Sequence, residues 1–293
     1  MMDGAVVLDK PSGITSHDAV VVVRRLLGES RIGHLGTLDP MAGGVLVLLV
    51  GRATRLARFY KDWEKVYEGA IRFGFATATY DSTGAATSGD LAPCLVESEV
   101  RSVFREFLGT RLQEPPPFSA KKVSGVPAYR LARKGKPVRL AAVPVTIHEF
   151  ELLAVEGPLA RFRARVSAGA YVRSLAHDLG QRLGTGAHLA ALRRTAVGEF
   201  GEAEAATLER LESLVRQGQV PIRPLEGLLA EIPAAPISSE DAEKTAQGRD
   251  LEIECPAERV RLFDGSGRLL AIAERTAGGR FHPIVVLNSV KNG

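Results

Sequence analysis

The sequence predicts an α+β fold followed by a small C-terminal part rich in β-structure. Residues 145–152 and 159–168 alternate apolar and polar side chains, as two paired strands do. Residues 15–27 and 98–108 instead carry apolar side chains at helical spacing. Beyond a Pro- and Ala-rich stretch at 232–236, which we interpret as a linker, a Gly-Ser-Gly hairpin signal predicts mainly β-structure to the end of the chain.

The composition is that of an ordinary globular protein with enough apolar material for a core. Of 293 residues, 45% are hydrophobic and 25% are charged. We expect no secretory signal, and no apolar stretch approaches the ~20 residues that a membrane helix needs. Cys94 and Cys255 lie far apart without a CxxC pattern, so neither a disulfide nor a metal site is expected. These features predict a cytoplasmic protein.

The N-terminal region predicts a buried strand at Gly4–Lys10 and then a helix. Thr15 or Ser16 can cap this helix, and Gly28 can end it. A dense loop follows at Arg31–Leu46, reading RIGHLGTLDPMAGGVL.

This loop places His34, Thr37 and Asp39 among four glycines and a proline. The glycines allow positive φ and a close approach of the backbone, whereas the proline fixes φ and lacks an N–H donor. Such a loop can hold a functional carboxylate in one position. It can equally be a turn between core elements in which Asp39 bonds its own backbone. The pattern by itself leaves both interpretations open.

The next elements are predicted from apolar runs and alternation. Val45–Val50 reads as a strand buried on both faces, and 52–60 as a helix with Arg55 and Arg58 outside. Residues 66–75 alternate, which puts Tyr67 on the apolar face of a strand. A phenol in that position is usually a core residue whose hydroxyl is satisfied.

Residues 114–139 form the most unusual stretch in composition. The net charge of the chain is only +4 and its pI about 9.2, but this segment carries seven cations against a single carboxylate. Phe118 and Tyr129 lie among those charges, and three prolines precede them. The pattern predicts a projecting basic arm suited to phosphate contact and base stacking, and the alternative is a solvated loop. Its cations are Lys121, Lys122, Arg130, Arg133, Lys134, Lys136 and Arg139.

The remainder of the chain alternates strand and helix signals. Arg161, Arg163 and Arg165 fall on one strand face, either as a basic stripe or as an ordinary exposed face. Tyr171 and Arg173 fall in the first turn of a predicted helix at 171–179. An apolar-faced segment follows, and then further helices and strands. The ranges are 188–194 for that segment, 207–217 and 239–247 for helices, and 259–264, 268–274 and 284–287 for strands.

Seven motifs occur in one order along the first 200 residues. GHLGTLDPMAGGVL at Gly33–Leu46 resembles the catalytic motif of the TruB-type tRNA pseudouridine synthases, of the bacterial type. Any one motif is weak by itself, but seven in the family's order make a specific match. The other six are KPSGITSHDAV at Lys10–Val20, KVYEG at Lys65–Gly69, PPPFSAKK at Pro115–Lys122, AYRLARKG at Ala128–Gly135, GAYVRSLAHDLG at Gly169–Gly180 and GAHLAALRRT at Gly186–Thr195.

The resemblance implies a mixed, mainly antiparallel sheet flanked by helices, with a small PUA-like domain at the C-terminus. The implied reaction converts uridine 55 in the T-loop of tRNA to pseudouridine. The glycosidic bond breaks, the uracil turns, and a carbon–carbon bond forms, so the resemblance implies no cofactor and no metal. Because the target uridine is buried in the T-loop, the enzyme must flip it out.

The resemblance also assigns roles to single residues. Asp39 corresponds to a carboxylate nucleophile that bonds transiently to the sugar or base, with a glycal-type path through proton abstraction as the open alternative. Arg173 corresponds to the arginine that pairs with this aspartate. Tyr67 corresponds to a tyrosine that stacks on the flipped base and assists a proton transfer.

Other residues are expected to bind the substrate. Tyr171 lines the same pocket in the family, Leu192 matches a leucine near the base, and His34 matches a histidine that holds the rearranged T-loop. In the basic arm, the residues expected to clamp the T-arm are Lys121, Arg130 and Arg133.

We therefore expect a catalytic domain at 1–232, which includes the arm at 114–139, and a PUA-like RNA-binding domain at 236–293. The expected partner is tRNA, contacted at the T-arm and the acceptor stem by a monomer with no membrane association. The chain departs from the family at two places. Residues 77–81 read TATYD, with Asp81 at the position of a family aspartate, and Gly43 stands where a Ser or Thr is common.

Two other functions are compatible with the same motifs. One is a tRNA-binding or tRNA-folding protein with a mainly non-catalytic role, and the other is a subunit of a guide-RNA-dependent pseudouridine synthase. The set of Asp39, Tyr67 and Arg173 favours an enzyme over a pure binding protein. A nucleotide-phosphate enzyme is disfavoured because the chain lacks GxxxxGK[ST].

Overall fold

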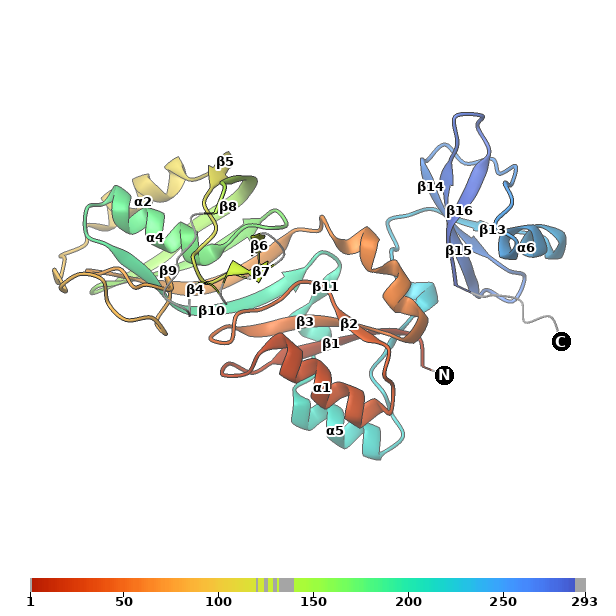
Figure 1. The fold of residues 1–293 in the computed structure, drawn as a ribbon, viewed down its shortest axis with the longest axis horizontal. Helices are drawn as coiled ribbons and strands as arrows, with labels where there is room; N and C mark the ends of the chain where they lie inside the picture. Colours follow the sequence, from red (N-terminus) through yellow and green to blue (C-terminus); the bar gives the residue numbers. More distant parts are fainter. Residues whose placement is uncertain (1, 120, 124–125, 129–130, 132–139, 288–293) are drawn as a thin grey trace.

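The chain builds a ten-stranded sheet and a separate four-stranded sheet, with helices packed on them (Figure 1). The structure is a computed structural model that describes residues 2–119, 121–123, 126–128, 131 and 140–287. No helix in this described part of the chain is long and apolar enough to cross a membrane.

The ten-stranded sheet has the order β12-β1-β3-β10-β4-β9-β8-β5, with β2 paired to β3 and β11 paired to β10. Among these strands only β3 and β10 pair in parallel, so the sheet is mixed and mainly antiparallel, as predicted. The strands are β1 (Gly4–Lys10), β2 (Ile32–His34), β3 (Gly43–Val50), β4 (Lys65–Phe73), β5 (Gly109–Gln113), β8 (Val143–Glu156), β9 (Leu159–Val166), β10 (Ala187–Val197), β11 (Phe200–Gly201) and β12 (Arg223–Pro224).

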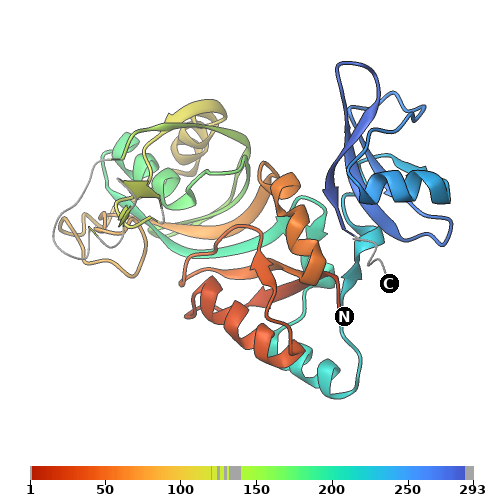
Figure 2. The same ribbon diagram turned by 45° about the vertical axis from the view of Figure 1, so that its right-hand side comes forward.

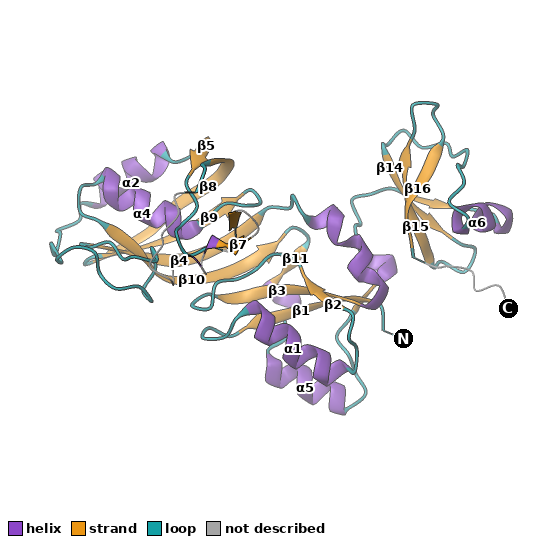
Figure 3. Cartoon of the chain, viewed as in Figure 1, coloured by secondary structure: helices purple, strands orange, loops and turns teal. Residues whose placement is uncertain are grey.

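In the described part of the chain, α-helices lie against this sheet towards both of its ends (Figure 3). Their apolar faces and one face of the sheet form a continuous core, which contains Val20, Phe104 and Leu175 of the helices together with strand residues such as Leu46. The sequence signals of the first helix are confirmed. Thr15 caps it in a reciprocal pair with Asp18, and Gly28 ends it at φ 63°. The helices are α1 (Ser16–Leu27), α2 (Glu97–Glu106), α4 (Val172–Arg182) and α5 (Leu208–Arg216).

The opposite face of β1 and β3 packs on the 3-10 helix η1 (Gly51–Tyr60) and on the four-stranded sheet (Figure 2). Val47 of β3, Leu56 of η1 and Ile272 belong to this second core. The prediction of a helix at 52–60 with Arg55 and Arg58 outside is therefore confirmed in position, but the helix is of the tighter 3-10 type.

The four-stranded sheet has the order β13-β14-β15-β16 and its own small core. The predicted hairpin is β14 and β15, and the last predicted strand is extended into β16. The predicted linker at 232–236 is partly wrong, because its last three residues form β13 and pair in parallel with β14. The elements are β13 (Ala234–Pro236), α6 (Ser239–Ala246), β14 (Arg259–Phe263), β15 (Leu269–Arg275) and β16 (Phe281–Val286).

Strand pairing and ion pairing decide between the interpretations of two further segments, 188–194 and the arginine stripe on β9. The segment 188–194, whose type the sequence left open, is the middle of strand β10. On β9, Arg165 pairs with Glu64 at 2.7 Å and with Glu149 at 2.9 Å, and Arg161 lies 3.8 Å from Glu156. This part of the stripe therefore behaves as an exposed, ion-paired sheet face.

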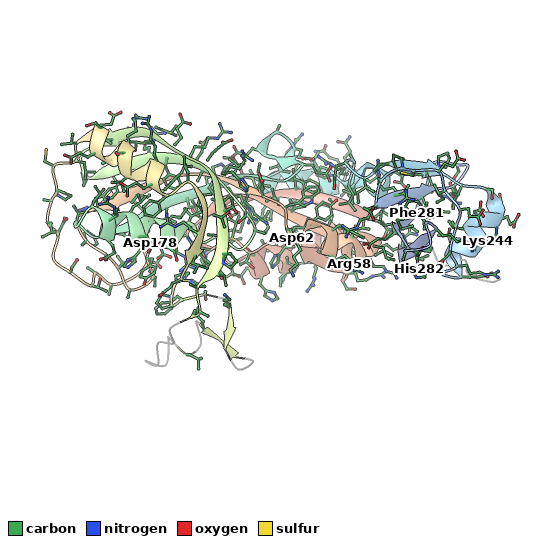
Figure 4. All side chains as sticks on the ribbon, turned by 90° about the horizontal axis from the view of Figure 1, so that it is seen from above. Arg58, Asp62, Asp178, Lys244, Phe281 and His282 are labelled. Atoms are coloured by element: carbon green, nitrogen blue, oxygen red, sulfur yellow. The ribbon has the colours of Figure 1, made fainter. Side chains whose placement is uncertain are left out.

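The basic arm begins beyond β5 and contains the short hairpin of β6 (Lys122–Val123) and β7 (Val126–Pro127). Figure 4 shows this hairpin projecting from the body of the molecule. Of the predicted arm residues, Lys121 is half-buried, whereas Arg130 and Arg133 lie outside the described residues.

Candidate active site

The loop between β2 and β3 presents the carboxylate of Asp39. Its backbone forms a turn in which Ala42 N donates to the Asp39 carbonyl at 3.0 Å. Ser16 fixes the residue before it, because Leu38 N donates to Ser16 Oγ at 2.8 Å and Ser16 Oγ donates to the Leu38 carbonyl at 3.1 Å. The loop is thus a turn between core strands, but its carboxylate is directed to a partner far away in sequence.

That partner is Arg173 in the first turn of α4. Its Nε and Nη2 donate to the two carboxylate oxygens of Asp39 at 2.8 and 2.9 Å, the bidentate geometry in which arginine grips a carboxylate. The Arg173 side chain is only 5% exposed, whereas that of Asp39 is 32% exposed. The guanidinium is therefore locked inside the protein, and the carboxylate keeps one side open to solvent.

Two other segments complete the surroundings of the guanidinium. Arg173 Nη1 donates to the Thr79 carbonyl at 3.1 Å, and Nη2 donates to the Phe118 carbonyl at 3.1 Å. The Asp81 carboxylate lies 3.7 Å from Arg173 Nε and is 7% exposed. Arg173 therefore connects the Asp39 loop, the loop after β4 and the base of the basic arm.

Asp81 is a site residue that the sequence motifs indicate only as the position of a family aspartate. Its Oδ1 accepts hydrogen bonds from Thr79 Oγ1 at 2.6 Å and from Thr83 N and Oγ1 at 3.0 and 2.6 Å. These bonds aim its second oxygen at Arg173. The cluster thus sets two carboxylates against one guanidinium. The signal that could have identified it is the single carboxylate in the Thr-rich segment 77–83.

Two buried cations lie beneath the Asp39 loop and were not singled out from the sequence. Arg194, 1% exposed, donates from Nε to the Val45 carbonyl at 2.8 Å, and from Nη2 and Nη1 to the Gly36 and Thr37 carbonyls at 3.1 and 3.5 Å. Lys10 is also fully buried, and its Nζ donates to two backbone carbonyls at 2.8 Å. Burial, together with the nearby Arg194 charge, lowers the pKa of Lys10 to about 8.

Tyr67 and Leu192 lie on neighbouring strands of the same core. Tyr67 on β4 is directly opposite Arg194 on β10, two residues from Leu192. Directly opposed residues, and residues two apart on a strand, share a sheet face, so these three side chains lie on one face. Tyr67 and Leu192 are buried in the core cluster that also contains Leu38 of the Asp39 loop. The structure therefore agrees with Tyr67 as a core phenol beside the loop.

Tyr171 precedes α4 and is pinned by Gln113 at the end of β5. Gln113 Nε2 donates to the Tyr171 carbonyl at 3.0 Å, and Tyr171 N donates back to Gln113 Oε1 at 2.8 Å. Burial raises the pKa of the Tyr171 phenol, and the charges of Arg173 and Asp39 also act on it. Tyr171 is thus fixed two residues before Arg173, at the start of the helix that carries the guanidinium.

His34 ends β2 at the entrance of the loop and is half-buried. Burial lowers the pKa of His34, and the positive charges of Arg194 and His17 lower it further. Its Nδ1 has no hydrogen-bond partner among the described residues. A neutral imidazole with a free ring nitrogen is suited to binding rather than to supplying a fixed charge.

The described side chains bring together no three His, Cys, Asp or Glu residues that could hold a metal ion. What they do assemble is the half-exposed carboxylate of Asp39, the buried guanidinium of Arg173 that grips it, and the second carboxylate of Asp81 at 3.7 Å from that guanidinium. Tyr171 lies two residues before Arg173. Tyr67 belongs to the core cluster that contains Leu38 of the Asp39 loop. Such a set can perform nucleophilic or proton-transfer chemistry on a polar substrate.

Comparison with known proteins places this site in a family. Residues 24–172 match the model described as TruB family pseudouridylate synthase (N terminal domain). Residues 173–230 match the model described as tRNA pseudouridylate synthase B C-terminal domain. These two models together span the Asp39 loop, β4 and α4.

Full-length relatives and solved structures agree with these matches. A tRNA pseudouridine synthase B of Solibacter usitatus is 47% identical, covering 98% of this chain and 100% of its own. The protein of that description from Thermobifida fusca is 44% identical, with 98% and 99% covered. A solved Cbf5-Nop10-Gar1 complex contains a chain with a TM-score of 0.74 at 26% identity, covering 97% of this chain and 85% of that one.

The fold and these matches define the chain as a pseudouridylate synthase, an isomerase. More narrowly, the chain belongs to the TruB family.

Proposed function

We propose that this chain converts uridine 55 in the T-loop of tRNA to pseudouridine and that it does so as a single chain without a guide RNA. The observation that carries the proposal is the bidentate contact between Arg173 and Asp39, which holds a carboxylate that remains 32% exposed. The tRNA substrate is supported by the relatives named tRNA pseudouridine synthase B, which are similar over nearly the whole chain.

The reaction rearranges bonds and transfers no group to or from the nucleotide. The C1′–N1 bond of uridine breaks, a C1′–C5 bond forms, and the proton on C5 is replaced by one on N1. Asp39 acts as the carboxylate nucleophile and bonds transiently to the sugar or base. In the alternative path the same carboxylate abstracts a sugar proton and a glycal forms.

Arg173 serves this carboxylate by fixing both of its oxygens and by balancing its charge. The guanidinium donates to Asp39, Thr79 and Phe118, which lie in three different segments, and these hydrogen bonds restrict its rotation. The geometry is therefore set before binding, which favours catalysis.

The remaining residues bind the flipped nucleotide. Tyr67 stacks on the uracil and assists a proton transfer, while Tyr171 and Leu192 line the pocket and His34 contacts the rearranged T-loop. Extruding a base costs a few kcal/mol, of which stacking on a phenol offsets roughly 1–3 kcal/mol.

The presence of two separate sheets supports a division into two domains. Residues 1–232 form the catalytic domain, in which the arm at 114–139 clamps the T-arm. Residues 236–293 form a PUA-like domain that contacts the acceptor stem. The contacts that join them include Arg261 on β14, which donates to the carbonyls of Ile232, Glu226 and Leu228 at 2.7, 3.2 and 3.2 Å.

The decisive experiment incubates the purified chain with unmodified tRNA and, separately, with an isolated T-arm hairpin, and then maps pseudouridine at single-nucleotide resolution. We expect one new pseudouridine, at position 55, in both RNAs without any added RNA. Conversion only after a guide RNA is supplied would favour the guide-dependent alternative. Tight tRNA binding without conversion would favour the non-catalytic binding protein.

The arm has its own test, because phosphate contacts make binding depend on salt. Replacing Lys121, Arg130 and Arg133 together by Gln should weaken tRNA binding. The slope of log Kd against log salt concentration should decrease by up to about three, one for each phosphate contact that is lost. The matched control is Arg161→Gln on β9, which removes a cation that lies beside Glu156. An unchanged salt slope in the triple variant would favour the alternative interpretation, in which the arm is a solvated loop.

A further inference from the structure

Tyr80 lies in the loop after β4 with an unusual backbone. Its φ of 64° makes it one of three non-glycine residues with positive φ in the described chain. A left-handed conformation is strained for an L-residue with a side chain, so neighbouring contacts must hold it. Backbone bonds contribute on both sides, since Tyr80 N donates to the Thr77 carbonyl at 3.2 Å and Leu189 N donates to the Tyr80 carbonyl at 3.0 Å.

The Tyr80 ring is stacked on the imidazole of His177. The ring centroids are 3.8 Å apart and the planes differ by only 10°. His177 lies on α4 four residues after Arg173, and residues so spaced share a helix face. One face of α4 therefore supplies both the guanidinium that grips Asp39 and the ring that covers Tyr80.

The stack joins two neutral rings. Burial lowers the pKa of His177, and its Nδ1 has no hydrogen-bond partner in the described part of the chain. Burial raises the pKa of Tyr80, and the nearby Asp178 and Glu114 raise it further. The contact therefore depends on the ring faces and on burial, and not on a charge at His177.

The neighbours of Tyr80 explain what the stack holds in place. Thr79 precedes it, and its carbonyl accepts the Arg173 Nη1 hydrogen bond at 3.1 Å. Asp81 follows it, and its carboxylate lies 3.7 Å from Arg173 Nε. The left-handed turn at Tyr80 thus presents two acceptors on either side of one ring to the same guanidinium.

We propose that Tyr80 and His177 are positioning residues of the isomerisation: their stack clamps the 79–81 turn onto α4 and thereby fixes the orientation of Arg173 towards Asp39. This inference rests on the proposed function of the Asp39 site. Neither ring contacts the reacting atoms, so the pair acts through Arg173. Loosening the turn frees the guanidinium to rotate away from the bidentate geometry, and small displacements at a reacting carboxylate slow reactions strongly.

The variants distinguish the contribution of the Tyr80 ring from that of the left-handed backbone at residue 80. Tyr80→Gly removes the ring yet adopts positive φ without strain, and Tyr80→Phe keeps the ring but removes the hydroxyl. His177→Ala removes the stack, and His177→Phe restores a flat ring of similar size. The matched control is Phe75→Leu, which breaks another aromatic–histidine pair, with His188 at 4.6 Å, in the same region.

The measurements are the single-turnover rate of pseudouridine formation, the Kd for tRNA and the Tm of each variant. We expect Tyr80→Gly and His177→Ala to lower the rate about 10-fold or more with Kd changed less than about 2-fold. Tyr80→Phe, His177→Phe and Phe75→Leu should stay near the wild-type rate. The double variant Tyr80→Gly/His177→Ala should be no slower than the worse single variant, because both remove one interaction.

Several outcomes would overturn the inference. A wild-type rate in Tyr80→Gly, or a loss in Tyr80→Phe equal to that in Tyr80→Gly, contradicts a role for the stack. Equal losses of rate, binding and Tm indicate a merely structural contact.

An activity-independent readout separates this inference from the proposed function. In ¹H–¹⁵N spectra the Arg173 Nε–H signal should be sharp in the wild-type chain and broadened in Tyr80→Gly. If the wild-type chain makes no pseudouridine but the Arg173 signal is still broadened in Tyr80→Gly, only the proposed function is refuted. An unaffected signal refutes the clamp.

Discussion

The loop that carries Asp39 and the helix that carries Arg173 are held in place by different kinds of contact. On the loop side, a buried guanidinium donates to backbone carbonyls, as Arg194 does to Gly36, Thr37 and Val45. On the helix side, the guanidinium of Arg173 is itself the group that is held, by two carboxylates and by the carbonyls of two remote loops.

We expect the contacts on the loop side to determine the stability of the fold and the contacts on the helix side to determine the rate of isomerisation. The contacts under the loop bury polar backbone that would otherwise lack partners, so breaking them should lower stability. The contacts around Arg173 orient one side chain, so changing them should lower the rate of reaction while the protein stays folded. The following substitutions test that separation, in order of decreasing expected effect.

Asp39→Asn should have the largest effect. It keeps the shape of the side chain but removes the nucleophile and its charge, so isomerisation should fall by at least about 10³-fold. Binding of tRNA and Tm should change little. Asp9→Asn, which removes a carboxylate paired with Arg193 at 3.0 Å, is the control and should retain activity. Near-normal turnover in Asp39→Asn would show that Asp39 is not the catalytic carboxylate.

Arg173→Lys should come next, with a rate lowered by about 10²-fold at unchanged Tm. Lysine keeps the positive charge but cannot grip both carboxylate oxygens and the carbonyls of Thr79 and Phe118 together. The test is the single-turnover rate beside the tRNA Kd. If charge alone sufficed, the lysine variant would react at nearly the wild-type rate.

Arg194→Met should mainly lower stability. It leaves the carbonyls of the loop without donors in a buried position, and the free energy of unfolding should fall by about 3 kcal/mol in denaturant titrations. Arg193 next to it is 46% exposed and ion-paired, so Arg193→Met should cost at most about 1 kcal/mol. Equal losses in the two variants would contradict the assignment of the loop side to folding.

Substitution of Asp178 on α4 should have the smallest effect, a change in how the stability of the fold depends on pH. Burial raises the pKa of its carboxyl from 3.8 to about 6, against the lowering effect of Arg111. The folded state then binds more protons than the unfolded state between those values, so the stability contributed by this group falls as pH rises from about 4 to 6.

Asp178→Asn removes that dependence. At pH 7 the variant should be more stable than wild type by about 1 kcal/mol, allowing for partial exposure, and at pH 4 the two should be similar. Thermal unfolding at both pH values measures this. A variant that is less stable at pH 7 would mean that the carboxylate is stabilised by its surroundings.

The sequence by itself determined the local elements and the identity of the central residues. The cap at Thr15, the stop at Gly28 and the strand periodicities depend on neighbours within a few residues, so they could be read directly. The motif match supplied Asp39 and Arg173 as a pair. The prediction of a linker at 232–236 was partly wrong because its last three residues pair with β14, 27 residues further along the chain.

Only the tertiary structure decided how the site is supported. Arg173 meets Asp39 across a separation of 134 residues, and Arg194 reaches the Asp39 loop because β10 lies parallel to β3. No local pattern encodes that Lys10 is buried beneath the loop or that Tyr80 stacks on His177. The physical reason is that propensity and periodicity act over one or two turns of chain, whereas strand order chooses which distant side chains share a face.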